Sequence, residues 1–282
     1  MTFAQQQTGL MPAHGLNAGF VSSPFFRKAF VVLAMLFCLI YLFTSWSSSP
    51  AVFAADNSFF VFFDAITRKS WAFDTLIVDI FMTNTIKLFP ILLVAVWLLF
   101  EHRNGGKRIS FFGCILAGSF ISMIISRVMQ NFSAHRPRPL HNPSIDYQLP
   151  FGIQDSVLKG WSSFPSDTSA LAFSIVAGIF MASTRLGLAA LAWAVMVVSF
   201  PRAYAGLHYP SDLLGGALIG FICTICAVPV VQYLAISKPV TAIPVKWHPL
   251  LWALTFFYLF QMGTMFNDIR AYGSYVKTVF GF

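Results

Sequence analysis

The chain has 282 residues, of which 57% are hydrophobic and 10% are charged, and its mean hydropathy is +0.72. Because a typical globular domain carries about 25% charged residues, this composition excludes a soluble enzyme, a disordered protein and a disulfide scaffold. The net charge of +8 comes from sparse cations between apolar runs, which fits membrane topology better than nucleic-acid binding. A multi-pass helical membrane protein is therefore expected.

The N-terminal residues 1–28 are polar and contain Gly and Pro, so we expect a loose cytosolic tail. Beyond the tail, apolar runs close to the roughly 20 residues that a membrane-crossing helix needs predict an all-α membrane bundle. Residues 29–236 are expected to form a six-helix core, and residues 237–282 a loop and a seventh, C-terminal helix. The predicted spans are 29–46, 85–100, 109–130, 166–184, 186–204, 211–236 and 250–266.

Residues 55–82 form an amphipathic segment between the first two predicted spans. Acidic side chains such as Asp56, Asp64 and Asp74 are interspersed with aromatic ones there, a pattern typical of helices that lie in the membrane surface. The preceding run, 29–46, is expected to stay in the protein as a span. The stretch ahead of the weak signal-peptide cleavage pattern at 52–54 is too long to favour removal.

Loop charges predict the orientation of the bundle. One side carries eight cations and a single acid, Glu101, and the other side carries all nine Asp residues and the remaining ten cations. Since cytosolic loops are enriched in Lys and Arg, we expect the first side to be cytosolic and the protein to lie in the cytoplasmic membrane with a cytosolic N-terminus. The cations on that side are Arg27, Lys28, Arg103, Lys107, Arg108, Arg185, Lys238 and Lys246.

Three polar clusters, residues 131–139, 163–168 and 201–212, fall on the predicted periplasmic or extracellular side. Helix ends that share a membrane face can converge on one pocket. The planar guanidinium groups of Arg138 and Arg202 suit phosphate oxygens. The start of the fourth span also offers free N–H groups and the positive end of a helix dipole. The outer ends of the spans are therefore expected to bind a phosphate group.

His208 and Asp212 lie four residues apart in the third cluster. On one helical face, or across a turn into a helix, Asp212 can accept the Nδ1 proton of His208. That contact leaves Nε2 available as a nucleophile or base. Together with the cations, this pair predicts a phosphoryl-transfer site that needs no metal and no cofactor.

The spacing of these residues resembles the type-2 phosphatidic acid phosphatase superfamily of integral membrane lipid phosphatases. That family's signature is K-x6-R-P, then P-S-G-H, then S-R-x5-H-x3-D. The resemblance covers roughly residues 55–235, and the third motif has the R-x5-H-x3-D spacing in full. The matching residues are Arg138-Pro139, Pro165-Ser166, Arg202, His208 and Asp212.

The resemblance implies a role for each matching residue. His208 would attack phosphorus and form a phosphohistidine, and Asp212 would orient it. The phosphoryl oxygens would be bound by Arg138, Arg202, Ser166 and the backbone amides after Pro165. Asn131 and Asp167 are also expected among the phosphate-binding residues. Water would then release the phosphate.

The sequence departs from the family pattern at four positions. Asn131 stands at the lysine position, Pro201 at the serine position, and Asp167 at the glycine position of P-S-G-H. Thr168 stands where the family has the histidine understood to protonate the leaving group. Threonine cannot do this at neutral pH, so the general acid is missing, replaced or unnecessary.

If the acid has been replaced, Asp167, His135 and His141 are near enough in sequence to supply a proton. If it is unnecessary, the leaving group must depart unaided. The pKa of an alcohol is similar to that of water, which is about 15.7. A phosphate group has a second pKa of about 6. A site without the acid is therefore expected to favour a lipid diphosphate, such as a polyprenyl diphosphate, over a monophosphate.

Two alternatives stay open at this point. The same residues could serve a lipid-linked phosphotransferase, in which a hydroxyl acceptor replaces water. The chain could also be a non-catalytic phospholipid-binding or transport protein with a degenerate site, although a pure binder has less need of an Asp-oriented histidine. In each case the expected partners are a phosphorylated membrane lipid and the bilayer, with no nucleic acid.

Overall fold

A computed structural model describes residues 49–101, 108–237 and 244–269, together with the single residues 41, 45, 272 and 275. All regular secondary structure in these residues is helical. The predicted tail, 1–28, and nearly all of the first predicted span, 29–46, lie outside the described residues. Residues 102–107 and 238–243, which belong to two predicted cytosolic loops, also lie outside the described residues.

The helices fall into an N-terminal group, a central bundle and a C-terminal helix. The N-terminal group is α3 (Pro50–Ile66), α4 (Trp71–Thr75), the π-helix η1 (Leu76–Phe81) and α5 (Asn84–Lys87). The bundle is α6 (Phe89–Phe100), α7 (Arg108–Phe132), α8 (Asp167–Ala182), α9 (Thr184–Trp193), the π-helix η4 (Ala194–Ser199), α10 (Phe200–Tyr204) and α11 (Pro210–Ser237). The 3-10 helices η3 (Pro139–His141) and η6 (Val245–Trp247) lie in the connections, and α12 (His248–Gly263) follows η6.

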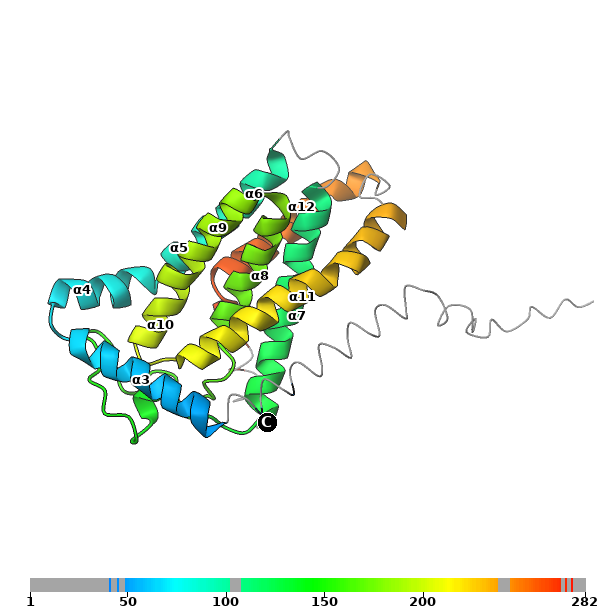
Figure 1. The fold of residues 1–282 in the computed structure, drawn as a ribbon. Helices are drawn as coiled ribbons and strands as arrows, with labels where there is room; N and C mark the ends of the chain where they lie inside the picture. The colour runs from blue at the N-terminus through cyan, green and yellow to red at the C-terminus, as the bar shows by residue number, and fades with distance from the viewer. Residues whose placement is uncertain are drawn as a thin grey trace, which may run out of the picture.

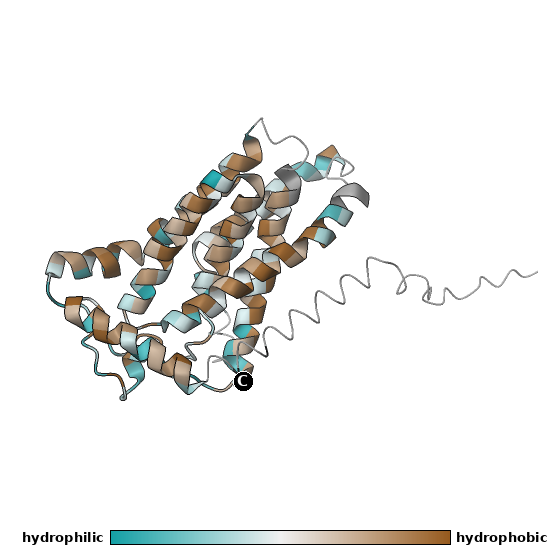
Figure 2. Cartoon of the chain, viewed as in Figure 1, coloured by the Kyte–Doolittle hydropathy of each residue, from teal (hydrophilic) through white to brown (hydrophobic). Residues whose placement is uncertain are grey.

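Three segments of the described chain are long and apolar enough to cross a membrane: Phe111–Phe132, Thr184–Tyr204 and Pro210–Tyr233. The helices α6 and α8 are also apolar but shorter. Hydrophobic residues make up most of the length of the bundle helices (Figure 2). The prediction of an all-α, multi-pass membrane protein is confirmed, and the count of six core helices plus a seventh stays a prediction.

The predicted span 85–100 is interrupted near Leu88. The short helix α5 ends at Lys87, and α6 starts again at Phe89 with Pro90 in its first turn. Proline suits the first turn of a helix, where its missing N–H leaves no hydrogen bond unmade. The apolar pattern alone did not reveal this break.

Helices α8 and α11 pack unusually closely at their site-bearing ends. A Cβ atom added to Gly216 of α11 would lie 2.2 Å from the carbonyl oxygen of Ser166, and one added to Gly220 would lie 2.2 Å from that of Ala170. Only glycine permits this backbone approach. It holds the first turn of α8 beside the first turn of α11, where two of the polar clusters lie.

Helices α3 and α4 lie across the end of the bundle where α10 ends and α11 begins (Figure 1). Phe60 and Phe63 of α3 are buried, whereas Phe59 and Phe62 are exposed. The Phe60 ring meets that of Tyr209 at a centroid distance of 5.9 Å. The amphipathic segment therefore packs its apolar face against the bundle end and closes over the polar clusters.

Candidate active site

The structure brings the three polar clusters together through backbone hydrogen bonds between them. The N–H of Ser163 donates to the carbonyl of Arg136 at 2.9 Å, and the N–H of Ser166 donates to the carbonyl of Asp212 at 3.1 Å. The N–H of Leu140 likewise donates to the carbonyl of Gly206. The clusters thus form one site at the end of the bundle beneath α3.

His208 is buried at the centre of this site, with 1% of its surface exposed. Its Nδ1 lies 2.9 Å from the carbonyl oxygen of Ser163. A carbonyl can only accept, so Nδ1 carries the proton and Nε2 carries the lone pair. Nε2 faces the Nη1 donor of Arg138 at 3.2 Å, which is consistent with the same tautomer.

Burial, together with the positive charges of Arg138 and Arg202, lowers the pKa of His208 to about 4. The Asp212 side chain acts in the opposite direction without overcoming these effects. Since this value lies well below the ordinary value near 6.5, the imidazole is neutral at pH 7. A neutral imidazole with its proton on Nδ1 offers Nε2 as a nucleophile.

Asp212 contacts His208 differently from the sequence expectation. Its Oδ2 lies 3.8 Å from Nδ1, beyond hydrogen-bond distance. The same oxygen accepts from the backbone N–H of Tyr209 at 2.9 Å. Asp212 is the third residue of α11, and a carboxylate there reaches back to the N-cap N–H. The carbonyl of Ser163 accepts the hydrogen bond from Nδ1–H in its place, and Asp212 is a nearby negative charge.

Arg136 and Asp56 hold the Asp212 carboxylate in position. Neither residue was predicted from the sequence to belong to the site. Arg136 pairs with Asp212 through Nη1 and with Asp56 through Nη2, the latter at 2.7 Å. Its guanidinium also lies over the ring of Tyr209, 4.1 Å from the centroid. Asp56, which is 2% exposed, accepts from both the N–H and the hydroxyl of Ser211. The interfacial helix α3 therefore supplies a buried acid that braces the start of α11.

Arg138 points its guanidinium at His208 from the opposite side. It donates to the carbonyls of Leu207 at 2.7 Å and Ser162 at 3.3 Å. Its Nε is buried without a hydrogen-bond partner, a costly arrangement that an anionic ligand would relieve. Burial lowers the pKa of the guanidinium from its usual value, but arginine stays charged at pH 7.

Arg202 contributes to the same site from the end of α10. Its carbonyl accepts from the N–H groups of Leu207 and His208, which shapes the loop that carries the histidine. Its positive charge lies close enough to add to the lowering of the His208 pKa. Both arginines named from the sequence are therefore near the imidazole.

The first turn of α8 holds Ser166, Asp167 and Thr168. Ser166 is the N-cap, and its hydroxyl accepts from the N–H of Ser169. Asp167 pairs with Arg127 at 3.0 Å and accepts from the Thr168 hydroxyl at 3.3 Å. The pair compensates the negative charge of Asp167 next to the candidate phosphate site. Since Arg127 and Thr168 both bind this carboxylate, its geometry does not favour Asp167 as a proton donor.

The remaining candidates lie at the edge of the site. His135 is exposed in the turn after α7, and Asn131 is exposed on the last turn of that helix. His141 has its Nε2 3.0 Å from the carbonyl oxygen of Val157. Among the described residues, no three His, Cys, Asp or Glu side chains gather as a metal site would require, and the metal-free, cofactor-free mechanism stays a prediction.

The family model described as the PAP2 superfamily matches residues 109–236, which include every catalytic-site residue discussed above except Asp56. Residues 109–236 are therefore similar to the PAP2 superfamily of membrane phosphatases. The resemblance that the residue spacing indicates is confirmed over this segment. The match ends before α12, so the C-terminal helix lies outside the family segment.

Two curated relatives are similar to this chain, and one of them is named a diphosphatase. One is an undecaprenyl-diphosphatase, BcrC, of Bacillus subtilis, 26% identical over 145 residues that cover 51% of this chain and 68% of the relative. The other is described as a bacitracin transport permease protein, BcrC, of Bacillus licheniformis. It is 27% identical over 134 residues, which cover 46% of this chain and 58% of the relative, less than two thirds of its length.

Two solved structures are similar at 20% sequence identity. A transmembrane PAP2 type phosphatidylglycerolphosphate phosphatase from Bacillus subtilis matches with a TM-score of 0.47, covering 73% of this chain and 96% of that one. LpxE of Aquifex aeolicus matches with a TM-score of 0.38, covering 69% and 93%.

Proposed function

We propose that this PAP2 superfamily lipid phosphatase acts on a lipid diphosphate, with His208 as the nucleophile. The observation that carries the proposal is the state of the His208 ring, neutral, buried, and fixed with its proton on Nδ1 by the Ser163 carbonyl. Its lone pair at Nε2 lies beside the Arg138 guanidinium. A phosphoryl group that binds Arg138 would then lie next to the attacking nitrogen.

The reaction would proceed in two displacements. Nε2 forms a bond to the terminal phosphorus, the bond from that phosphorus to the bridging oxygen breaks, and lipid monophosphate leaves with the electron pair. Water then attacks the phosphohistidine, the P–N bond breaks, and inorganic phosphate departs while the proton of water passes to solvent. The imidazolium formed between the two steps is stabilised by the Ser163 carbonyl and the Asp212 charge.

The preference for a diphosphate rests on the leaving group. Thr168 donates its hydroxyl to Asp167, and Asp167 is paired with Arg127, so neither is suited to protonate an alcohol. General acid catalysis is typically worth about 10²–10⁴-fold. A lipid phosphate leaves without that help, and the undecaprenyl-diphosphatase among the relatives supports the same substrate class.

The proposal also includes the topology. The loop charges favour a cytosolic N-terminus and place the site at the periplasmic or extracellular face of the cytoplasmic membrane. In this arrangement residues 29–236 form the catalytic core and residues 237–282 an appended loop and helix. The lipid diphosphate would enter from the outer leaflet.

Phosphate release by the purified protein tests the proposal. Without added metal, the wild type should release phosphate from a polyprenyl diphosphate and much less from the matching monophosphate and from phosphatidic acid. His208→Ala should abolish release while binding of the lipid persists. Release from the monophosphate as fast as from the diphosphate would contradict the leaving-group argument.

Two other results would favour the alternatives. Phosphate transfer that appears only when a lipid or sugar hydroxyl is supplied would identify a phosphotransferase that uses the same residues. Binding of the lipid diphosphate with no turnover under either condition would identify a non-catalytic lipid-binding protein.

A further inference from the structure

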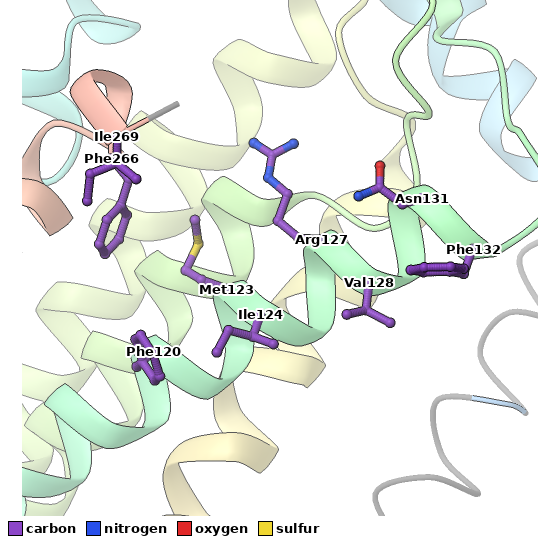
Figure 3. Close-up of a pocket in the computed structure, with 9 residues that line it drawn as sticks. All are labelled: Phe120, Met123, Ile124, Arg127, Val128, Asn131, Phe132, Phe266 and Ile269. Atoms are coloured by element: carbon purple, nitrogen blue, oxygen red, sulfur yellow. The ribbon is translucent and has the colours of Figure 1, made fainter. Parts of the chain in front are cut away.

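An apolar groove of about 360 Å³ runs along α7 and lies outside the site described above (Figure 3). Its α7 wall includes Phe120, Ile124 and Val128, which are each about half-exposed. The facing wall is formed by Phe266 and Ile269, beyond the end of α12. The volume lies in the range of roughly 300–1,000 Å³ that is usual for small-molecule sites.

One end of the groove reaches the active site. Arg127 lines the groove and also pairs with Asp167, the first residue of α8. Both charges lie close enough to Arg138 to shift the pKa of its guanidinium. A molecule whose head is bound at Arg138 therefore has an apolar channel starting beside it, with Asn131 also at that end (Figure 3).

The C-terminal wall of the groove is held firmly against α7. The Tyr258 hydroxyl contacts the Ser119 hydroxyl at 3.0 Å and donates to the Leu116 carbonyl at 3.1 Å. After α12, Met265 and Phe266 both adopt positive φ values, of 60° and 55°. Non-glycine residues rarely adopt this conformation, and it persists only where the surroundings enforce it.

Packing on both sides of this turn provides that enforcement. Met265 is buried, and the Phe266 ring packs edge-on against Tyr258 at 5.9 Å. The Phe266 N–H donates to the Gln261 carbonyl at 2.7 Å. The turn therefore fixes the position of Phe266, so that its ring forms a defined wall of the groove.

We propose that this groove binds the apolar chain of the lipid phosphate whose head group reacts at His208, so that the segment after α12 takes part in selecting the chain. The inference rests on the proposed function for its head group. An occupant with an anionic head at Arg138 and an apolar tail fits the groove, which has a polar end at Arg127 and Asn131 and an apolar remainder. Because residues 263–269 lie outside the family match, chain selection would be a property that this chain adds to the shared core.

Paired substrates test the proposal by kinetics. Ile124→Trp should fill the groove and lower kcat/KM for a long polyprenyl diphosphate by about tenfold, the loss expected for one or two methylene-sized apolar contacts. Turnover of a short, water-soluble prenyl diphosphate with the same head should change less than twofold. Leu218→Trp is the matched control, because Leu218 is also partly exposed, at 41%. Leu218 lies on α11, eight residues from the helix end at the site, and Ile124 lies eight residues from the corresponding end of α7.

The ratio of the two kcat/KM values decides the outcome. An unchanged ratio in Ile124→Trp would overturn the proposal, whether both substrates lose activity or neither does. Hydrolysis of neither substrate by the wild type would overturn the proposed function instead, and the groove is then tested by labelling the unmodified protein.

Photolabelling gives this second measurement. A non-hydrolysable lipid diphosphonate with a photoreactive group on its apolar chain should label the peptides containing residues 120–132 and 266–269. The same chain carrying a neutral alcohol head should label them at least several-fold less. Equal labelling by the two probes would mean that the groove holds bulk lipid only, and the proposal would fail.

Discussion

His208 is surrounded by groups that set its protonation before any substrate arrives. The Ser163 carbonyl fixes the proton on Nδ1, and burial together with Arg138 keeps the ring neutral. The Asp212 carboxylate, which the spacing of the motif suggested as the direct partner, caps α11 instead. The proton position of the proposed nucleophile is therefore set mainly by a backbone group of the loop that precedes α8.

The pKa of His208 can be measured directly. In the phosphate-free protein, ¹⁵N NMR of labelled histidines should show one ring that titrates near pH 4 and is absent from His208→Ala. Since the unfolded value is about 6.5, the native state binds fewer protons between the two values. Stability from this group is present above about pH 6.5 and is lost as the pH falls toward 4. A midpoint near 6.5 would show that the ring is more solvated than the structure indicates.

Asp56 should matter for turnover although it does not reach His208. In Asp56→Asn, Arg136 loses a charged partner and the start of α11 loses part of its brace. A hydrogen bond to a charged group is worth about 1.5–3 kcal/mol, so we expect kcat to fall about tenfold or more with a small change in KM. Asp64→Asn, on the same helix with its Oδ1 bound to the N–H of Gln148, is the control. Equal effects of the two variants would point to a general weakening of α3.

The residues found from sequence are those whose motif partners lie nearby in the chain. Arg202, His208 and Asp212 fall within one short stretch, so their spacing carried information. Asp56 was missed because its partner, Ser211, is 155 residues away and no local pattern marks a buried acid. The pairing of Arg127 with Asp167 joins two helices that are distant in sequence, so no local motif indicates it.

At the level of the helices, the contact of α8 with α11 determines where the site forms. Gly216→Ala should reduce stability by about 1–3 kcal/mol and lower activity strongly, because the new methyl meets the Ser166 carbonyl at the start of α8. Thermal unfolding in detergent and phosphate release measure the two effects. Gly113→Ala, whose methyl would meet only the Val231 side chain at 3.0 Å, should be far milder. A Gly216→Ala protein with wild-type activity would show that α8 can move without harming the site.

Hydrophobic runs predicted the positions of most helices but not their interruptions. The predicted spans 109–130 and 211–236 correspond to α7 and α11, because long apolar runs leave few alternatives. The break at Leu88 was missed, since its causes are the Pro90 helix start and tertiary packing around Leu88, which is fully buried. Apolar residues occur both on surfaces that face lipid and in the interior of the protein, so an apolar run does not show where a helix is interrupted.

At the level of the whole molecule, the proposed orientation makes an accessibility prediction. In a background without native cysteines, Ser144→Cys, exposed in the loop between α7 and α8, should react with a membrane-impermeant maleimide added to intact cells. Thr184→Cys, exposed at the turn between α8 and α9, should react only after the membrane is permeabilised. The reverse pattern would place the site in the cytosol and would contradict the charge-based topology.

The bond between Asp56 and the start of α11 also has a consequence for how the protein is made. Synthesis proceeds from the N-terminus at about 5–20 residues per second, so the 155 residues that separate Asp56 from Ser211 take about 8–30 seconds to emerge. Throughout that interval the carboxylate of α3 lacks the partner that it has in the finished protein. The chain therefore cannot complete the proposed site until α11 has been synthesised and inserted, and we expect no phosphatase activity before that point.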